Sequence, residues 1–300
     1  MKLLLCGSES PLGRSLLFRL EQLPFPVVTP EADLLATIST RQLEKYLRDE
    51  RVTGIVNVQH LPHSADPREL ERQYSRVPQT LSLAAAATDC FMLQLSDCQV
   101  FSGLQAHAYR EADEPDTQTP YGAMRWAAER TVIDTCPRHL ILRTGELFSS
   151  LGQNVLTNLI TAWQRGESAP VSVRYQFCPT AVRDAARVIV ALLLQLDCGI
   201  EPWGVYHYCG TDAVSYRDFA RLVKQILEAQ PDCDMAMAMH EMAEGKAPLS
   251  WALDCGKIRD TFGIKQHAWR AGLTSGVKRA LQANDNPGVL PEGDPDGGCD

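Results

Sequence analysis

The chain opens, after Met1, with Lys2-Leu3-Leu4-Leu5-Cys6-Gly7-Ser8-Glu9-Ser10-Pro11-Leu12-Gly13-Arg14, and this stretch decides the fold. The apolar run has the length of a buried strand, and leucines at Leu16, Leu17 and Leu20 continue at helical spacing. Strand, glycine turn and helix therefore follow one another within about twenty residues. Such a start is typical of a dinucleotide site, and also of an ordinary connection in any parallel α/β protein.

The glycines of this turn have definite physical tasks. Gly7 allows a sharp turn, Gly13 lets the helix pack close to the strand, and free N–H groups at the helix start face a phosphate. Ser10 stands where the middle glycine of G-x-x-G-x-x-G is expected, which leaves less room for a pyrophosphate. We expect Gly7, Ser10, Leu12 and Gly13 to line the cofactor site.

The identity of the dinucleotide stays open at this stage. A short second strand is predicted at Phe25 to Thr29, and Asp33 follows it. Asp33 is a candidate contact for the adenine end, with a solvated loop acid as the alternative. Neither an acid for the ribose hydroxyls nor a base for a 2′-phosphate is cleanly placed. NAD and NADP therefore both remain possible cofactors.

Composition excludes several classes of protein. The formal net charge of -8 and the pI near 5.4 argue against a nucleic-acid or anionic membrane surface. The sequence holds ten cysteines with no C-x-x-C pair and no metal-ligand spacing, so we expect buried, reduced thiols, no metal and a cytoplasmic location. No stretch approaches the roughly 20 apolar residues that span a bilayer. A small molecule is the expected partner.

Apolar strands alternate with helical segments along the first half of the chain. Strands are predicted at 54–58, 91–95 and 140–144, with helices over 68–88 and 121–130 between them. This alternation predicts an α/β fold with a Rossmann-type, doubly wound parallel sheet. Ligands of such sheets bind at the carboxyl ends of the strands.

The second half has a mixed order of elements. We expect residues 1–148 to form the dinucleotide-binding domain, with a helix near 181–197 returning to it. Residues 149–280 should form mostly a smaller C-terminal α/β lobe that faces the substrate. Residues 283–300 contain proline, glycine and acids but neither lysine nor arginine, so a disordered tail is expected there.

Several motifs then point to one lineage. Ser96 to Gly103 lies just beyond a predicted strand edge, and Tyr121 and Arg125 share a helix face one turn apart. These stretches resemble the S-T-D-Y-V-F-x-G and P-x-x-Y-G-x-x-K-x-x-x-E motifs of the dTDP-4-dehydrorhamnose reductase group of extended short-chain dehydrogenases/reductases. Further matches in order are Leu142-Arg143-Thr144, Pro179-Thr180, Gly204-Val205-Tyr206-His207, Ser215 to Ala220, and Pro248 to Asp254 with Phe262-Gly263 and Trp269. The resemblance covers about residues 1 to 280.

The resemblance implies a catalytic triad that this chain alters. In the family a tyrosine donates a proton, a serine or threonine polarises the carbonyl, and a lysine lowers the tyrosine pKa and holds the nicotinamide ribose. Tyr121 falls on the tyrosine position, Asp97 on the serine/threonine position beside Ser96, and Arg125 on the lysine position. Because both exchanges occur in one triad, we hypothesise that Asp97 and Arg125 face each other as a hydrogen-bonded pair.

Two functions of different class follow from this resemblance. One is an NAD(P)-dependent reductase of a 4-keto sugar nucleotide, with Tyr121 as proton donor and Arg125 as ribose holder. The alternative is a non-catalytic nucleotide- or sugar-nucleotide-binding regulatory subunit of the same lineage, which acts through a protein partner or as a homodimer. A reductase of some other carbonyl also remains open, because the substrate lobe is the least readable part.

Three other residues or pairs have more ordinary interpretations. His60 and His63 are expected in a loop, because Pro62 separates them and no further ligand is near. His207 is expected as a hydrogen-bonded core histidine. Arg143 is either a buried structural arginine or a phosphate contact.

Overall fold

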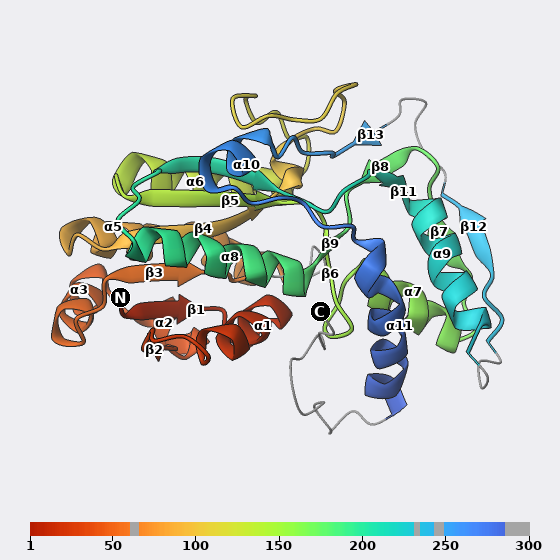
Figure 1. Cartoon of the computed structure of the whole chain (residues 1–300), viewed down its shortest axis with the longest axis horizontal. Coiled ribbons are helices and arrows are strands. Elements are labelled where there is room, and N and C mark those ends of the chain that lie inside the picture. Colours follow the sequence, from red (N-terminus) through yellow and green to blue (C-terminus); the bar gives the residue numbers. More distant parts are fainter. Residues whose placement is uncertain (61–65, 231–234, 243–248, 286–300) are drawn as a thin grey trace.

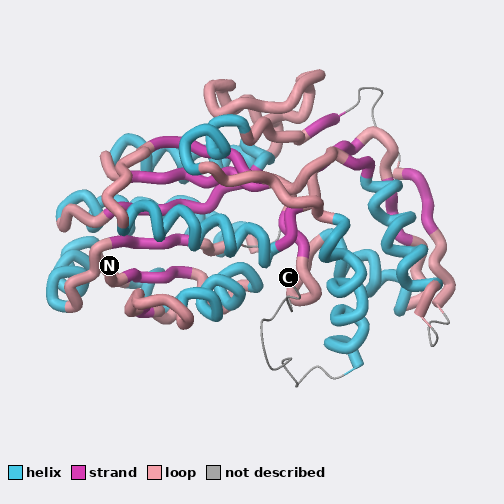
Figure 2. The backbone as a smooth tube through the Cα atoms, in the orientation of Figure 1, coloured by secondary structure: helices cyan, strands magenta, loops and turns pink. Residues whose placement is uncertain are grey.

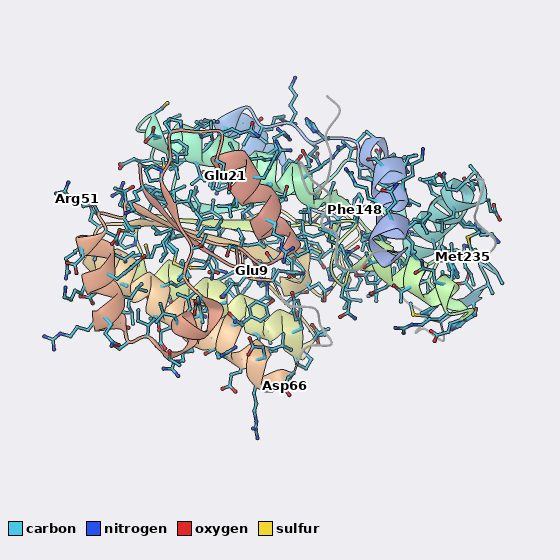
Figure 3. All side chains as sticks on the ribbon, turned by 90° about the horizontal axis from the view of Figure 1, so that it is seen from below. Glu9, Glu21, Arg51, Asp66, Phe148 and Met235 are labelled. Atoms are coloured by element: carbon cyan, nitrogen blue, oxygen red, sulfur yellow. The ribbon has the colours of Figure 1, made fainter. Side chains whose placement is uncertain are left out.

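The computed structural model describes residues 1–60, 66–230, 235–242 and 249–285 (Figure 1). The chain forms a large sheet with helices on both faces, and a smaller body of short strands and helices beside it. In the view of Figure 3, Phe148 lies between the larger part, which carries Glu9 and Arg51, and the far end of the molecule at Met235. The predicted α/β architecture is confirmed.

The main sheet is parallel and carries its six strands in the order β10-β5-β4-β3-β1-β2 within the described residues. The strands are β1 (Leu3–Cys6), β2 (Val27–Val28), β3 (Gly54–Asn57), β4 (Phe91–Asp97), β5 (His139–Thr144) and β10 (Gly204–Tyr208). From β1 the chain runs to β2 on one side of β1 and then to β3 on its other side. The topological switch point therefore lies between β1 and β3. Their carboxyl ends are the expected ligand edge.

Each face of this sheet is covered by its own helices (Figure 2). On one face α1 (Pro11–Leu20) and α8 (Val182–Asp197) pack together over Leu3, Leu5 and Leu93. The opposite face holds Leu4 and Met92 under the helices α3 (Thr40–Asp49), α5 (Val77–Ala87) and α6 (Pro120–Thr135). Alternate residues of one strand thus enter two cores, as a period of two requires.

The remaining elements connect these layers or form the smaller body. Near the main sheet lie α2 (Ala32–Thr37), α4 (Pro67–Glu71), the π-helix η1 (Arg72–Arg76), the 3₁₀ turn η2 (Cys98–Val100), β6 (Leu147–Phe148), β9 (Thr180–Ala181) and α10 (Gly256–Phe262). The smaller body contains α7 (Val155–Gln164), β7 (Ala169–Val171), β8 (Tyr175–Phe177), β11 (Val214–Ser215), α9 (Tyr216–Glu228), β12 (Met239–Glu241), β13 (Leu249–Ser250) and α11 (Arg270–Asp285). Its core is centred on Trp163, Phe219 and Trp269.

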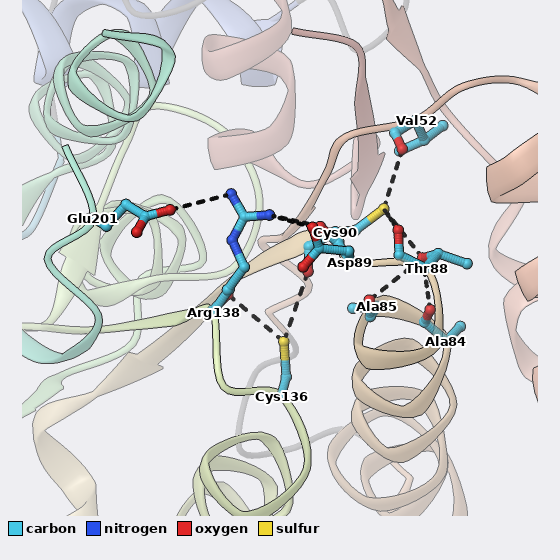
Figure 4. Close-up of polar contacts among 9 residues, drawn as sticks. All are labelled: Val52, Ala84, Ala85, Thr88, Asp89, Cys90, Cys136, Arg138 and Glu201. Atoms are coloured by element: carbon cyan, nitrogen blue, oxygen red, sulfur yellow. Dashed lines mark hydrogen bonds and ion pairs between the residues drawn. The ribbon is translucent and has the colours of Figure 1, made fainter. Parts of the chain in front are cut away.

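The amino edge of the main sheet, opposite the ligand edge, is held by polar contacts of loop residues (Figure 4). Arg138, just before β5, donates to the Asp89 carbonyl at 2.8 Å and pairs with Glu201 at 3.8 Å. The Cys90 thiol, just before β4, donates to the Val52 carbonyl. These residues fasten neighbouring strand starts, and the Cys90 thiol has the structural role expected of a buried cysteine.

The structure places the expected segments as follows. The long predicted helix over 68–88 is one continuous run with a π turn in its middle. Helix α8 packs on α1, and β10 lies at the edge of the main sheet although it follows residue 149. Helix α11 continues to Asp285, three residues into the stretch expected to be disordered, and the rest of that stretch lies outside the described residues.

Gly13 provides a direct test of the first turn. A Cβ built on Gly13 would lie 2.0 Å from the Gly7 carbonyl oxygen, so the backbone must shift to accept it. We expect Gly13→Ala to lower the free energy of unfolding by about 3 kcal/mol or more, measured by denaturant melting. The control is Gly276→Ala in α11, where the new methyl meets only Leu156 at 3.5 Å, and helix propensity predicts a gain of about 1 kcal/mol. Equal stability of Gly13→Ala and wild type would contradict this packing.

Candidate active site

Three neighbouring strands deliver polar residues to one cavity at the ligand edge. His60 follows β3, Asp97 ends β4, and Thr144 and Glu146 come at and just after the end of β5. The cavity has a volume of about 300 Å³ and is closed on its other side by residues around the start of α7. The full lining comprises His60, Asp97, Cys98, Gln99, Thr144, Gly145, Glu146, Leu147, Gln153, Asn154, Val155 and Asn158.

The sequence-predicted catalytic residues meet at Asp97. The Tyr121 hydroxyl donates to Asp97 Oδ2 at 2.8 Å, and Arg125 Nε lies 3.1 Å from the same oxygen. The Arg125 side chain is 1% exposed and that of Asp97 10%. Arg125 Nη2 donates to the Leu95 carbonyl at 3.0 Å. The hypothesis of an Asp97–Arg125 pair is confirmed as a buried ion pair, but the Nε–H does not have hydrogen-bond geometry.

The Asp97–Arg125 ion pair affects the protonation of Asp97 and of Tyr121. Burial alone would raise the pKa of Asp97, but the nearby Arg125 charge, with help from His60 and the hydrogen bonds, holds it below its usual value. Burial and the Asp97 charge together raise the pKa of Tyr121 well above its ordinary value. Asp97 is therefore an acceptor at neutral pH, and the Tyr121 proton is held by it.

Tyr74 is a site residue that sequence reasoning missed. It lies in the π-helix η1, is buried, and packs edge-on against Tyr121 with ring centroids 5.8 Å apart. The Arg125 guanidinium carbon lies 4.7 Å from the Tyr74 ring centroid, a cation–π contact. The extra residue of a π turn changes which side chain faces the sheet, and helical periodicity does not reveal it.

The predicted cofactor residues gather at the start of α1. Gly7 has a φ of +86°, and Ser10 caps the helix by accepting from the Gly13 N–H at 3.0 Å and donating to the Gly7 carbonyl at 2.7 Å. The Ser10 N–H also bonds the Gly7 carbonyl, at 3.1 Å, and Pro11 has no N–H. The Leu12 N–H takes no part in these contacts. The side chain of Asp33, in α2, lies outside the described part of the structure.

Gln59 is a second residue at the switch point that the sequence did not flag. It follows β3, and a Cβ built on Gly7 would lie 2.7 Å from the Gln59 backbone nitrogen. The Gln59 Oε1 atom is buried without a hydrogen-bond partner in the described residues. A buried, unpaired acceptor beside the glycine turn is an atom that a ligand donor would satisfy.

Arg143 and His207 are parts of a buried network and not of the cavity. Arg143 forms a two-pronged ion pair with Glu129, with contacts of 2.7 and 3.0 Å. His207 Nδ1 bonds the Tyr109 carbonyl at 3.1 Å, and burial together with the Arg143 charge lowers the pKa of His207 to about 3. The core role expected for His207 is confirmed, and Arg143 is a structural arginine.

The fold also assembles thiols that are far apart in sequence. Cys209 and Cys255 have their sulfur atoms 3.7 Å apart, and Cys98 lines the cavity. Burial raises the pKa of Cys98 well above its usual value, which keeps it a thiol. In the described residues the cysteines are free, and no group of three metal-binding side chains is placed to hold an ion. His63 lies outside those residues.

Curated proteins with different names are similar to this chain in sequence. The dTDP-4-dehydrorhamnose reductase of Aggregatibacter actinomycetemcomitans is 26% identical over 285 residues, which cover 91% of this chain and 97% of that protein. The methionine adenosyltransferase 2 subunit beta of Xenopus laevis is 26% identical over 202 residues, 65% of this chain and 59% of that protein. The lineage thus includes proteins named as reductases and one named as a subunit of another enzyme.

Solved structures share the fold. The dTDP-4-dehydrorhamnose reductase of Clostridium acetobutylicum superimposes with a TM-score of 0.78 at 22% identity, covering 94% of this chain and all of that chain. The Bacillus anthracis reductase, solved in complex with NADP, gives a TM-score of 0.74 at 18% identity, covering 92% and 96%. The sequence itself matches the RmlD substrate binding domain over residues 1–282. The chain therefore belongs to the RmlD substrate-binding-domain family of extended short-chain dehydrogenases/reductases.

Proposed function

We propose that this chain binds NADP(H) or NAD(H) and reduces the 4-keto group of a sugar nucleotide of the dTDP-4-dehydrorhamnose type. The observation that carries the proposal is the polar cavity at the carboxyl ends of β3, β4 and β5, next to the switch point of the sheet. Family membership over residues 1–282 supports the same substrate class. The cofactor would supply the hydride.

The first turn fits the ADP half of a dinucleotide. Bare backbone at Gly7 and Gly13 lets strand and helix approach, and the helix start gives a phosphate the Leu12 N–H. Asp33 stays a proposed contact for the adenine end. Arg125 stays the proposed ribose holder: its Nη1 has no hydrogen-bond partner in the described residues, but the side chain is 1% exposed and does not line the cavity. Comparing NADPH with NADH in the assay below decides between NADP and NAD.

The division of labour along the chain follows from this placement. Residues 1–148, with α8, would hold the dinucleotide, and most of residues 149–280 would hold the sugar nucleotide. In the described residues no helix combines the length and apolar character needed to cross a bilayer. Free cysteines throughout the described chain support the cytoplasm as the proposed compartment.

A second candidate function has one specific observation in its favour. The Tyr121 proton is held by Asp97, and an ionised carboxylate cannot polarise a carbonyl as a hydroxyl does. A non-catalytic subunit that binds a nucleotide and contacts a protein partner would tolerate this arrangement. Binding of the reduced dinucleotide without turnover is its signature.

Turnover separates the two candidates. We expect wild-type protein to consume NADPH or NADH, followed by absorbance, only when a dTDP-4-keto-6-deoxy sugar is added. The hydride and proton must both reach the ketone, so one equivalent of reduced cofactor should disappear for each alcohol formed. Tight cofactor binding, measured by fluorescence titration, with no consumption would contradict the reductase and support the subunit.

Ser10 provides a matched test of the cofactor turn. Ser10→Gly removes the hydroxymethyl group and frees the Gly13 N–H, at the cost of a few tenths of a kcal/mol in helix capping. One additional N–H to a charged phosphate should tighten dinucleotide binding by about tenfold. Ser39→Gly makes the same change at the cap of α3 and should leave binding unchanged. Weaker binding by Ser10→Gly would argue against a phosphate at this turn.

A further inference from the structure

Glu146 is a second carboxyl group in the cavity. It follows β5 by two residues, after Gly145, and lines the same cavity as Asp97. The Tyr175 hydroxyl donates to Glu146 Oε2 at 3.0 Å, which leaves Oε1 outside that bond. The lining residues of the cavity, as the structure describes it, include neither lysine nor arginine.

The support of Glu146 is itself packed in place. The Tyr175 ring tilts against Trp251 with centroids 4.7 Å apart, and the Trp251 indole N–H bonds the Phe101 carbonyl at 2.9 Å. A Cβ on Gly145 would lie 2.3 Å from the Cys178 carbonyl oxygen, so the turn before Glu146 packs against Cys178 with no room for a side chain. The carboxyl group is therefore held at a fixed place on the cavity wall.

The other protic groups of the cavity are poorly suited to give up a proton. Asp97 is ionised, and the Tyr121 proton points to it. The Thr144 hydroxyl donates to the Ser96 carbonyl at 3.3 Å. The Cys98 thiol is held neutral by burial, and amides do not transfer protons at neutral pH. His60 and Glu146 are the titratable side chains that remain on the lining.

We propose that Glu146 is the proton donor to the carbonyl oxygen of a ligand in this cavity, in place of the tyrosine at position 121. The inference rests on the proposed reductase function and assigns its acid. It follows from the position of Glu146 on the cavity wall and from the engagement of Tyr121 with Asp97.

The proton balance of the step is simple. A ketone that gains a hydride at carbon, from a reduced nicotinamide, gains one proton at oxygen as the C=O π bond is lost. The O–H bond of the Glu146 carboxylic acid breaks and the O–H bond of the alcohol forms. Glu146 is left as a carboxylate and takes a proton back from water. Tyr175 then stabilises that carboxylate through the hydrogen bond already present.

The surroundings of Glu146 favour the acid form needed before the step. Burial raises the pKa of Glu146, and the Asp97 charge from β4 adds to it, while the Tyr175 hydrogen bond from β8 acts against both. Burial and the charge of the nearby Glu146 carboxylate raise the pKa of Tyr216, which lies in α9. His60 faces the cavity from the end of β3. An acid with a raised pKa is suited to donate a proton near neutral pH.

Kinetics give the first arm of the test. Glu146→Gln keeps an oxygen for Tyr175 but removes the transferable proton, so kcat should fall about 100-fold or more with KM little changed. Tyr121→Phe leaves the Glu146 acid in place, so its kcat should fall much less than that of Glu146→Gln. Glu111→Gln changes a half-buried glutamate that accepts from the His207 backbone N–H outside the cavity, and it should behave as wild type. Loss of activity in Tyr121→Phe or His60→Gln, with Glu146→Gln active, would overturn the proposal.

Infrared spectroscopy gives a second arm that needs neither cofactor nor turnover. At about pH 6, where an ordinary glutamate is almost fully ionised, the wild-type minus Glu146→Gln difference spectrum should show a carboxylic acid C=O band. That band should shift when the keto sugar nucleotide is added. A missing or unshifted band overturns the assignment whatever the activity. An inactive wild type with a band that shifts would contradict the proposed function and show only that a protonated Glu146 contacts the ligand.

Discussion

The buried ion pair between Arg125 and Asp97 is the constraint on which the site depends. A guanidinium that is 1% exposed must have a counter-charge, and Asp97 at the end of β4 provides it. The ionised Asp97 accepts a hydrogen bond from the Tyr121 hydroxyl, and the proton stays on Tyr121. The two exchanges relative to the family triad meet in one physical interaction, because Asp97 and Arg125 carry opposite charges 3.1 Å apart beside Tyr121.

Because Tyr121 is hydrogen-bonded to Asp97, the proposed proton donor of the cavity is a different group, Glu146. Burial raises the pKa of Glu146, and the negative charge of Asp97 across the cavity adds to it, so the surroundings favour a protonated second carboxyl group. Tyr74, in its π turn, packs against both Tyr121 and Arg125 and keeps them in place. The altered triad is then a rearranged site with a different acid, beside a first turn in which Gly7 and Gly13 leave no room for a Cβ.

Sequence reasoning predicted the features that are local in the chain. The strand–turn–helix start and the spacing of Tyr121 and Arg125 depend on residues that are close together in the sequence. The opposite charges at positions 97 and 125 suggested that these two residues pair. Tyr74 was missed because a π turn shifts the helical period. Glu146 follows β5 just as Asp97 ends β4, so the strand-edge rule would have flagged it. The contact of Cys209 with Cys255 joins residues 46 apart, and no local pattern carries it.

The most direct measurement is a double-mutant cycle on the ion pair, with Asp97→Asn, Arg125→Met and the double variant compared by denaturant unfolding. Each single change should cost about 3–5 kcal/mol, because it leaves a buried charge without its partner. The double variant should cost less than the sum by about 1–3 kcal/mol. Costs that add within about 0.5 kcal/mol would contradict the view that these two residues are coupled in one buried pair.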